Sequence, residues 1–339
     1  MGNFLDTVRE YFDEKNKVWL TGDLERLRKA AHVESTRSWW KRTGANIERK
    51  RQAAHWRRGT LLRAHTKVNV RNLLRDEASG VTKAVVDEHV TWVYRDNPNY
   101  AVESRVISHL QRWRLEGELW KLEKDLESDE LQRLPGVGSV HTPTQDLSSF
   151  EARFVRQGNQ DIDTNQGSSS RGPRNYDRVR ALRYSELWWN GWNPVYPKLE
   201  DDCTNFISQC LFAGRIPMTH TQSRAEGWWY KFTDGKKTEN WSYSWSTSHA
   251  LYLYLVNRLG AKRVSSARDL KVGDLVFYDW GGQGTFHHTA FVADFDNRGD
   301  PLVNAHTDAS WHRHYLYLDS RAWTARTRYA LVRIPDEIG

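Results

Sequence analysis

The chain has 339 residues, 38% of them hydrophobic and 12% aromatic, with a formal net charge of +7. This length suits about two domains, and the aromatic content favours packed cores over a disordered chain. The apolar runs are too short to cross a membrane, and the charged N-terminus lacks the apolar stretch of a signal peptide. We therefore expect a cytoplasmic protein, with export by an unrecognised route or association with the cell wall as the alternative.

The first 57 residues carry a helical pattern, and the next 70 carry a strand pattern. Apolar residues from Phe4 to Phe12 recur at intervals of three and four, which predicts one face of a helix. Alternation of apolar and polar residues is clear from Lys83 to Tyr94, and the sequence EGE at 116–118 predicts a hairpin turn. Residues 1–127 are thus expected to form an α+β domain with a curved antiparallel sheet, in an order similar to the NTF2-like or cystatin-like cone.

Positive charge is concentrated in residues 26–75, which hold 15 Lys and Arg residues and two acids, Glu34 and Glu48. Such a block is most often a solvated helix face, but it also suits an anionic polymer, such as teichoic acid, or a membrane surface. The sequence shows no zinc-finger spacing, Gly-rich phosphate loop or RNP-like aromatic motif here. Nucleic acid is therefore not expected as a partner.

Residues 128–173 differ in composition from the sequence on both sides. They are rich in Gly, Ser, Pro, Asn and Gln, which predicts a flexible linker. Beyond them, the pattern predicts three helices followed by strands in DLVFYDW, HHTAFVADFD, PLVNAHTD and YALVRI. Residues 174–339 are thus expected to form a second α+β domain.

Residues 199–214, LEDDCTNFISQCLFAG, contain both cysteines of the chain, Cys203 and Cys210. Apolar residues recur at three and four, which predicts a helix starting near Cys203 with Asp201 or Asp202 as its cap. A cysteine in the first helical turn meets unpaired N–H groups, so its pKa should be lowered and its thiolate favoured. Cys203 is therefore the candidate nucleophile.

Cys210 lies two helical turns further on and is expected to be an ordinary buried thiol. Its Cα atom should lie about 10 Å from that of Cys203, at 1.5 Å per residue. That distance is too long for a disulfide. Neither cysteine has the close Cys or His neighbours of a metal site, so we expect no metal and no other cofactor.

A thiolate nucleophile needs a base that accepts and donates a proton, and His288 is the candidate. It follows a polar turn and opens the strand HTAFVAD; the alternative is an ordinary strand histidine. A third polar group must orient the base. The following strand offers Asn304 and His306, which are two residues apart and share a face, so the sequence leaves both open.

Aromatic residues flank the predicted helix in the stretches WWNGWNPVY and GWWYKF. Their rings suit stacking on a sugar or an extended peptide, whereas packing in the core is the alternative. Asp202 could also hydrogen-bond an arriving amine. The candidate substrate-binding residues are Asp202, Trp192, Tyr196, Trp228 and Trp229.

The motifs DCTNF, VGDLVFYDW, HTAFVAD and VNAHT together resemble the NlpC/P60 and CHAP group of papain-like cysteine hydrolases. Residues 174–335 are closer still to an amidase domain found in Bacillus-type bacteria. The resemblance implies a papain-like fold, Cys203 as nucleophile and His288 as base. It implies His306 as the third residue, with Asn304 as the alternative, and amide bonds of peptidoglycan stem peptides as the substrate.

The expected function is therefore that of a cysteine amidase or peptidase, which attacks through a thiolate and forms an acyl-enzyme. Peptides of the bacterial cell wall are its expected substrate. One alternative is an acyltransferase that uses the same Cys and His. The other is a binding protein without activity, in which the basic N-terminal domain holds an anionic polymer. The sequence alone does not separate hydrolysis from transfer.

Overall fold

The structure is a computed structural model, and it describes residues 3–31, 37–57, 59–96, 99–127, 174–199, 201–232 and 240–338. The predicted linker, residues 128–173, lies outside the described residues. Within these ranges the protein is a mixed α and β structure with extensive antiparallel sheet, as the α+β prediction requires. None of the helices in the described ranges has both the length and the apolar character needed to cross a bilayer.

The chain divides into two compact units, and both are discontinuous in sequence. The first unit comprises Met1–Gly138, Phe295–Leu302 and Asp308–Ala325, and the second comprises Ser139–Asp294, Val303–Thr307 and Arg326–Gly339. The predicted boundary placed all residues after 173 in the second domain. Two late segments instead group with the first unit, because a strand at 310–314 pairs with the sheet there: Ser310 lies opposite Arg105, and Trp311 opposite Ser104.

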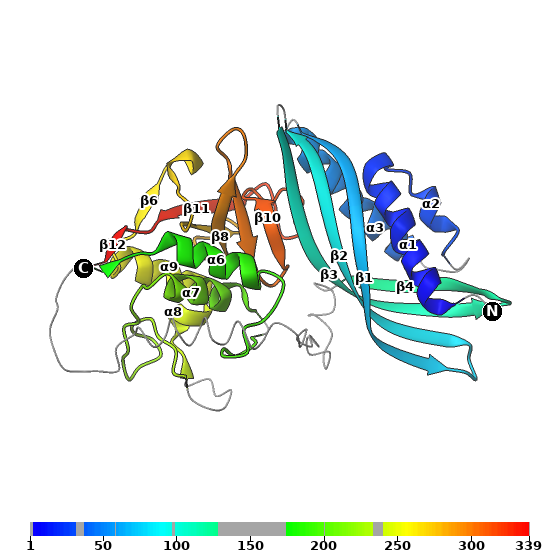
Figure 1. Cartoon of the computed structure of the whole chain (residues 1–339), viewed down its shortest axis with the longest axis horizontal. Helices are drawn as coiled ribbons and strands as arrows, with labels where there is room; N and C mark the ends of the chain where they lie inside the picture. Colours follow the sequence, from blue (N-terminus) through cyan, green and yellow to red (C-terminus); the bar gives the residue numbers. More distant parts are fainter. Residues whose placement is uncertain are drawn as a thin grey trace. The chain divides into compact units, whose positions relative to one another are not determined.

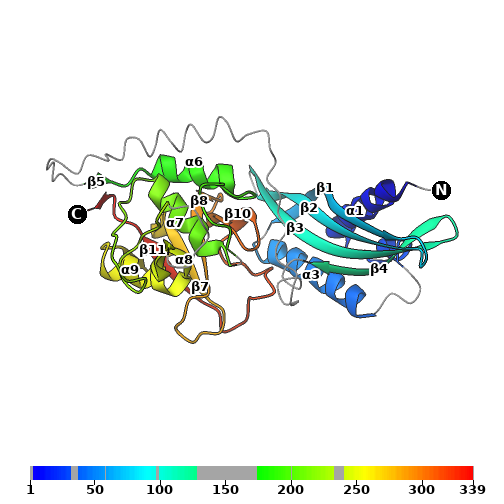
Figure 2. The ribbon, with the colours of Figure 1, turned by 90° about the horizontal axis from the view of Figure 1, so that it is seen from below.

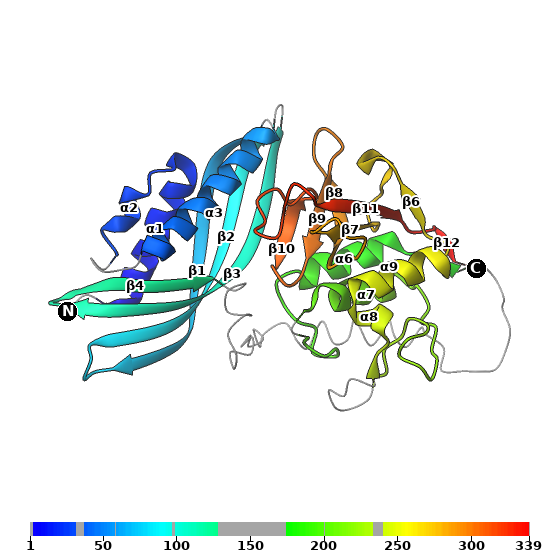
Figure 3. The same ribbon diagram turned by 180° about the vertical axis from the view of Figure 1, so that it is seen from behind.

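The first unit is a curved antiparallel sheet with helices on one face, and the strands bend around α1 and α3 (Figures 1 and 3). Strand β3 pairs with β2 along one edge, and with β4 and β10 along different parts of the other edge. The elements are α1 (Phe4–Thr21), α2 (Glu25–Arg28), α3 (Arg37–Trp56), β1 (Thr60–Asp76), β2 (Val81–Asp96), β3 (Asn99–Glu116), β4 (Leu119–Glu127) and β10 (Ser310–His314).

Local sequence explains the boundaries of these elements. The Asn3 side chain accepts from the Leu5 N–H at the start of α1, and Gly22 ends the helix with a φ of 76°. Helix α1 buries Phe4, Val8, Tyr11 and Phe12, so the predicted apolar face is confirmed. Gly117, with a φ of 63°, lies in the turn between β3 and β4, which confirms the predicted hairpin.

In the second unit, helices α6 to α9 lie on one side of the strands β7, β8 and β11 (Figures 1 and 2). The strand order is β9-β8-β7-β11-β6, and β5 pairs separately with β12. The elements are α6 (Arg178–Trp188), α7 (Cys203–Ala213), α8 (Tyr243–Ser246), α9 (Ser248–Asn257), β5 (Arg174–Asn175), β6 (Lys262–Val264), β7 (Leu275–Asp279), β8 (His288–Phe295), β9 (Pro301–Ala305), β11 (Arg328–Arg333) and β12 (Glu337–Ile338).

Candidate active site

Helix α7 begins at Cys203, so the predicted nucleophile does occupy the first turn of a helix. The apolar face of α7 enters the core through Phe206, Ile207 and Leu211. Cys210 lies on the same face and is fully buried, and burial raises its pKa well above the ordinary value. Both cysteines are free thiols on one helix. The predicted positions are confirmed: Cys203 begins the helix and Cys210 lies on its apolar face.

Asp202 is the N-cap residue of α7, which confirms the position predicted for one of the two alternatives, but its side chain makes no capping hydrogen bond. One carboxylate oxygen accepts from the Leu199 N–H at 3.2 Å and from Asn205 Nδ2 at 2.8 Å. The other oxygen lies 2.6 Å from His306 Nδ1. With only 2% of its surface exposed, Asp202 has its oxygens committed inside the unit. The predicted contact with a substrate amine is therefore not available in this arrangement.

His306 uses both of its ring nitrogens away from His288. Nδ1 faces Asp202, and Nε2 lies 2.7 Å from the carbonyl oxygen of Trp188. The ring stacks on Phe206 with centroids 4.0 Å apart and an interplanar angle of 11°. Because both nitrogens have acceptors, His306 has none left to orient His288 as the third catalytic residue. Its contacts tie the end of β9 to the last turn of α6 and to the residue before Cys203.

Asn304, the alternative third residue, also reaches α6. Its Nδ2 donates to Ser185 Oγ at 3.0 Å and to Glu186 Oε1 at 2.9 Å. The amide is completely buried. These bonds hold β9 against α6, and they give Asn304 a clear structural role.

The Cys203 thiol lies beside two hydroxyl groups at the start of α7. Its Sγ is 3.7 Å from Thr204 Oγ1 and 3.7 Å from Ser248 Oγ, and the two hydroxyls are 2.8 Å apart. Burial raises the pKa of Cys203, and hydrogen bonds from Thr204, Ser248 and the Thr289 backbone offset this only in part. The predicted lowering of the pKa at the helix start is therefore wrong, because only 5% of the residue is exposed and desolvation disfavours the thiolate.

His288 is the first residue of β8 and is 8% exposed. Its ring lies 5.3 Å from the ring of Tyr278, its partner on β7, and 6.0 Å from the nearly parallel ring of Trp280. The backbone of the next residue, Thr289, hydrogen-bonds to the Cys203 thiol. The residue that follows the predicted base thus lies near the predicted nucleophile, where the start of β8 approaches the start of α7.

The motif residues that follow Cys203 make hydrogen bonds that hold the start of α7 in position. Asn205 donates to the Pro197 carbonyl oxygen at 2.9 Å and accepts from Trp245 Nε1 at 2.8 Å. Thr204 follows the cysteine directly, so the motif itself could have identified it. Ser248 opens α9, 45 residues after Cys203, and nothing in the sequence near it predicts the contact.

Three of the predicted substrate-binding aromatics belong to the hydrophobic core. Trp228, Trp229 and Tyr196 are exposed by 0%, 1% and 7%. Tyr196 and Trp228 both pack against Trp245, in a cluster of rings next to α7. Stacking on a substrate is therefore wrong for these residues as they lie here. Trp192 differs, because it is half-buried and its ring lies 5.6 Å from that of His306.

The basic block at 26–75 is partly internal. Lys50 is buried and lies 2.6 Å from Glu103, and Arg71 lies 2.7 Å from Asp87. Both side chains pair with carboxylates inside the first unit and are not available to a polymer. Binding of an anionic polymer stays a prediction for the exposed members of the block.

One group among the described residues brings potential metal donors within 4.8 Å of one another: Asp296, Asp300 and His314. His314 Nδ1 accepts from the Leu316 N–H at 3.3 Å, so neutral His314 carries its hydrogen on Nε2. Nε2 faces Asp300 at 3.7 Å. Because it carries the hydrogen, Nε2 has no lone pair to offer a metal. The group is better explained as a histidine beside two carboxylates.

Comparison with known proteins matches the second half of the chain. Residues 175–332 fit the model of a family described as "putative amidase domain". The uncharacterized protein YhbB of Bacillus subtilis (strain 168) is 46% identical over 165 residues, which cover 48% of this chain and 51% of YhbB. The uncharacterized protein YjcM of the same organism is 28% identical over 135 residues, covering 37% of this chain and 29% of YjcM. The chain thus spans about half or less of these relatives.

Among solved structures, the intermembrane space region of the chloroplast protein ARC6 is similar at a TM-score of 0.26 and 10% identity. It covers 38% of this chain and 98% of its own, and a similarity of that size carries no argument about fold. The family match does carry one about activity. Residues 175–332 are similar to an amidase domain, which indicates hydrolysis of amide bonds.

Proposed function

We propose that the second unit is a papain-like cysteine amidase in which Cys203 is the nucleophile and His288 the general base. One observation carries the proposal: the backbone of Thr289, the residue that follows His288, lies close enough to the Cys203 thiol at the start of α7 to help lower its pKa. A thiol and an imidazole brought to one place by a helix start and a strand start are the two groups that acyl transfer through sulfur requires. The match to an amidase domain supports the same reaction.

The buried thiol determines how the first step proceeds. Because burial raises the pKa of Cys203, the resting nucleophile is the neutral thiol. His288 therefore accepts the proton as Sγ attacks the carbonyl carbon. The S–C bond forms, and backbone N–H groups of the first turn of α7, which have no intrahelical partner, stabilise the oxyanion. His288 then protonates the amine as the C–N bond breaks, leaving a thioester.

The second step releases the acid. His288 accepts a proton from a water molecule, whose oxygen attacks the thioester carbonyl. The C–S bond breaks, and the proton returns to Sγ, which restores the neutral thiol. An amine in place of this water would give a new amide. The nature of the product therefore separates an amidase from the acyltransferase alternative.

Tyr278 and Trp280 fix the His288 ring from the strand side, so part of its orientation comes from packing. Asp202 and His306 do not contact the reacting groups directly. They join the residue before Cys203 to β9 and α6, and are therefore positioning residues.

Asp202→Asn is expected to lower kcat by about 10- to 100-fold and to lower the free energy of unfolding by about 1–3 kcal/mol, since it leaves buried His306 without its carboxylate. Turnover and urea denaturation measure the two effects. Asp201→Asn is the matched control, because Asp201 is an exposed neighbour. Equal losses of activity in the two variants would contradict the positioning role of Asp202.

The reactivity of Cys203 tests the neutral-thiol step. Alkylation of the Cys210→Ala variant by iodoacetamide is expected to accelerate steadily from pH 6 to beyond pH 9, because the pKa of Cys203 is raised above its ordinary value of 9.0. The rate, followed by mass spectrometry, should show no plateau near neutral pH. A rate that is constant between pH 6 and pH 8 would mean a resting thiolate, against this mechanism.

The proposed substrates are peptidoglycan stem peptides. The amidase match and the resemblance of the motifs to wall hydrolases support this class, and half-buried Trp192 offers one ring beside His306. Purified muropeptides are incubated with the protein, and the products are identified by mass spectrometry. Fragments that together gain the mass of one water support the proposal. Intact muropeptides, with cleavage of a small amide instead, would remove the wall substrate and retain the amidase.

A further inference from the structure

The first unit contains a polar cavity that the amidase reaction does not use. It offers about 70 Å³ between α1, α3, the middle strands of the sheet and residues 308–321. One water needs about 10–15 Å³ of such space, so the cavity can hold several waters or a small organic ion. Its lining includes Trp19, Trp92, Lys50, Arg105 and Arg313.

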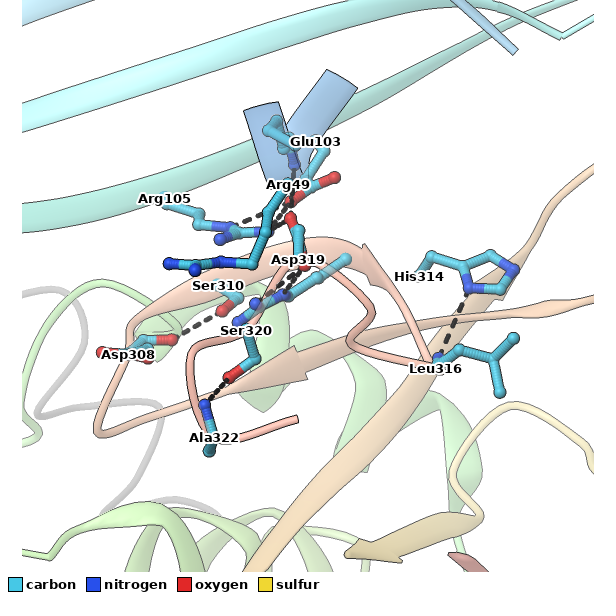
Figure 4. A network of polar contacts seen from close by, with 12 residues as sticks. Arg49, Glu103, Arg105, Asp308, Ser310, His314, Leu316, Asp319, Ser320 and Ala322 are labelled. Atoms are coloured by element: carbon cyan, nitrogen blue, oxygen red, sulfur yellow. Dashed lines mark hydrogen bonds and ion pairs between the residues drawn. The ribbon is translucent and has the colours of Figure 1, made fainter. Parts of the chain in front are cut away.

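Buried cations outnumber the carboxylates that pair with them at this cavity. Lys50 lies 2.6 Å from Glu103 and 3.1 Å from Asp319. Arg105 pairs with the same two carboxylates, Glu103 and Asp319 (Figure 4). Arg313 Nη2 lies 2.9 Å from Asp319. Three cations thus share two carboxylates, leaving one positive charge in excess within this cluster. We call these five residues the Asp319 cluster.

The excess positive charge affects the pKa of Lys50. Burial and the neighbouring Arg105 lower the pKa of Lys50 to about 8, although Asp319 and Glu103 oppose them. The ammonium is also held over the ring of Trp92, 4.1 Å from its centroid, which adds a weaker attraction. A further negative group beside Lys50 would therefore stabilise its charged form.

Three buried N–H donors around the cavity lack an acceptor among the described residues: Trp19 Nε1, Trp92 Nε1 and Arg313 Nη1. Each unsatisfied donor costs about 1–3 kcal/mol when it is kept from water. All three belong to residues that line the cavity, and all three are donors, so what they require is an acceptor.

One further carboxylate at the cavity is already engaged. Glu127 accepts from Asn46 Nδ2 at 2.7 Å and pairs with Arg321. Asp308 also lines the cavity, and its backbone carbonyl accepts from Ser310. Glu127 therefore does not supply the acceptor that the tryptophans lack, and it adds little uncompensated negative charge.

We propose that this cavity binds a small oxoanion, a carboxylate or a phosphate, through the three unsatisfied N–H donors and the excess positive charge of the Asp319 cluster. An oxoanion offers several acceptor lone pairs in a volume of this size. It would face two indole N–H groups and one guanidinium N–H, and it would complete the charge balance of the cluster. The site is separate from Cys203 and its reaction.

The test uses the full chain labelled with 5-fluorotryptophan and followed by fluorine NMR. Inorganic phosphate and acetate are titrated separately at constant ionic strength, with chloride and neutral acetamide as controls. The resonances of Trp19 and Trp92 are assigned with Trp19→Phe and Trp92→Phe. Saturable shifts of both resonances are expected with phosphate or with acetate. The anion that binds with the higher affinity shows whether the site prefers a phosphate or a carboxylate. Shifts that stay linear with every anion would overturn the proposal and mean that water fills the cavity.

Arg313→Lys keeps the charge but removes the unsatisfied guanidinium N–H, and it should weaken binding at least 10-fold. Arg112→Lys is the matched control, since Arg112 is on the same sheet, is largely exposed and does not line the cavity. If Arg313→Lys does not fold, Trp92→Phe replaces it, because it keeps an aromatic ring beneath Lys50 and removes the indole donor. Unchanged affinity in the folded variant would also overturn the site.

Discussion

Cys203→Ala is expected to reduce amide cleavage by roughly 10⁴-fold or more, because it removes the atom that forms the thioester. Thr204, Ser248 and the Thr289 backbone surround the thiol, and none of them is a nucleophile comparable to sulfur. The fold should survive, since Cys203 lies at the edge of the core and loses one sulfur atom. Turnover of the muropeptide substrate and the far-UV circular dichroism of the variant measure the two effects.

Cys210→Ala is the matched control on the same helix. Cys210 is completely buried in the core, so its truncation should lower the free energy of unfolding by about 1–2 kcal/mol and leave turnover nearly unchanged. Full activity in Cys203→Ala would contradict a cysteine mechanism. Activity lost equally in both variants would mean that α7 matters for the fold and not for the reaction.

Local patterns allowed much of this fold to be predicted. The apolar period from Phe4 to Phe12 determined α1, and the alternation from Lys83 to Tyr94 lies within β2. The helix from Cys203 was equally clear, because apolar residues in DCTNFISQCLFA repeat with the helical period. In each case the residues that define the element are neighbours in sequence, so the period alone carries the information.

Long-range contacts account for the predictions that failed. Asp202 suits a cap by position, but the carboxylate bonds to His306, 104 residues away. The strand β10 was not predicted, because SWHRH is polar, and it forms by pairing with β3. In α6 the apolar residues Val179 and Leu187 are 59% and 45% exposed. Its buried face instead contains polar groups such as Ser185, which a hydrophobic period does not reveal.

The features of the candidate site also separate into those that local sequence predicts and those that depend on the fold. Cys203 and His288 could be proposed from their residue types and their positions at the start of a helix and a strand. The raised pKa of Cys203 could not, because it depends on how deeply α7 is buried. The roles of Trp228 and Trp229 were also undetermined, since an aromatic stretch serves equally as a binding surface or as core.

Raising the pH from 6.5 to 8 is expected to lower the free energy of unfolding of the first unit by about 2 kcal/mol. The cause is buried His109, whose Nδ1 lies 2.8 Å from Asp125 and whose Nε2 lies 3.1 Å from Glu88. Two carboxylates face the two nitrogens, so the ring is favoured as imidazolium. Burial alone would lower the pKa of His109, but Asp125 and Glu88 outweigh it and raise the pKa to about 9.

The sign follows from the two states. Unfolded histidine has a pKa of about 6.5, so the stabilisation is complete below that pH and is lost as the pH rises toward 9. Lys15 lies 2.8 Å from Glu88, and after His109 loses its proton it is left as the one cation between two buried carboxylates. The lowered pKa of Lys50, about 8, and the lowered pKa values of half-buried His89 and buried His314 act in the opposite direction within this interval, since the unfolded chain binds more protons at these groups. The contribution of His109 is therefore isolated by comparison with a variant that lacks it.

Hydrogen exchange of β2 and β3 peptides in urea, corrected for intrinsic rates, measures this loss in the full chain. His109→Gln should remove most of the pH dependence, because glutamine does not titrate. His65→Gln is the matched control, since His65 is an exposed histidine on β1, and it should keep the dependence of the unsubstituted protein. If His109→Gln keeps the same slope, the protonated histidine is not what stabilises this network, and the buried Lys15–Glu88 pair must persist without it.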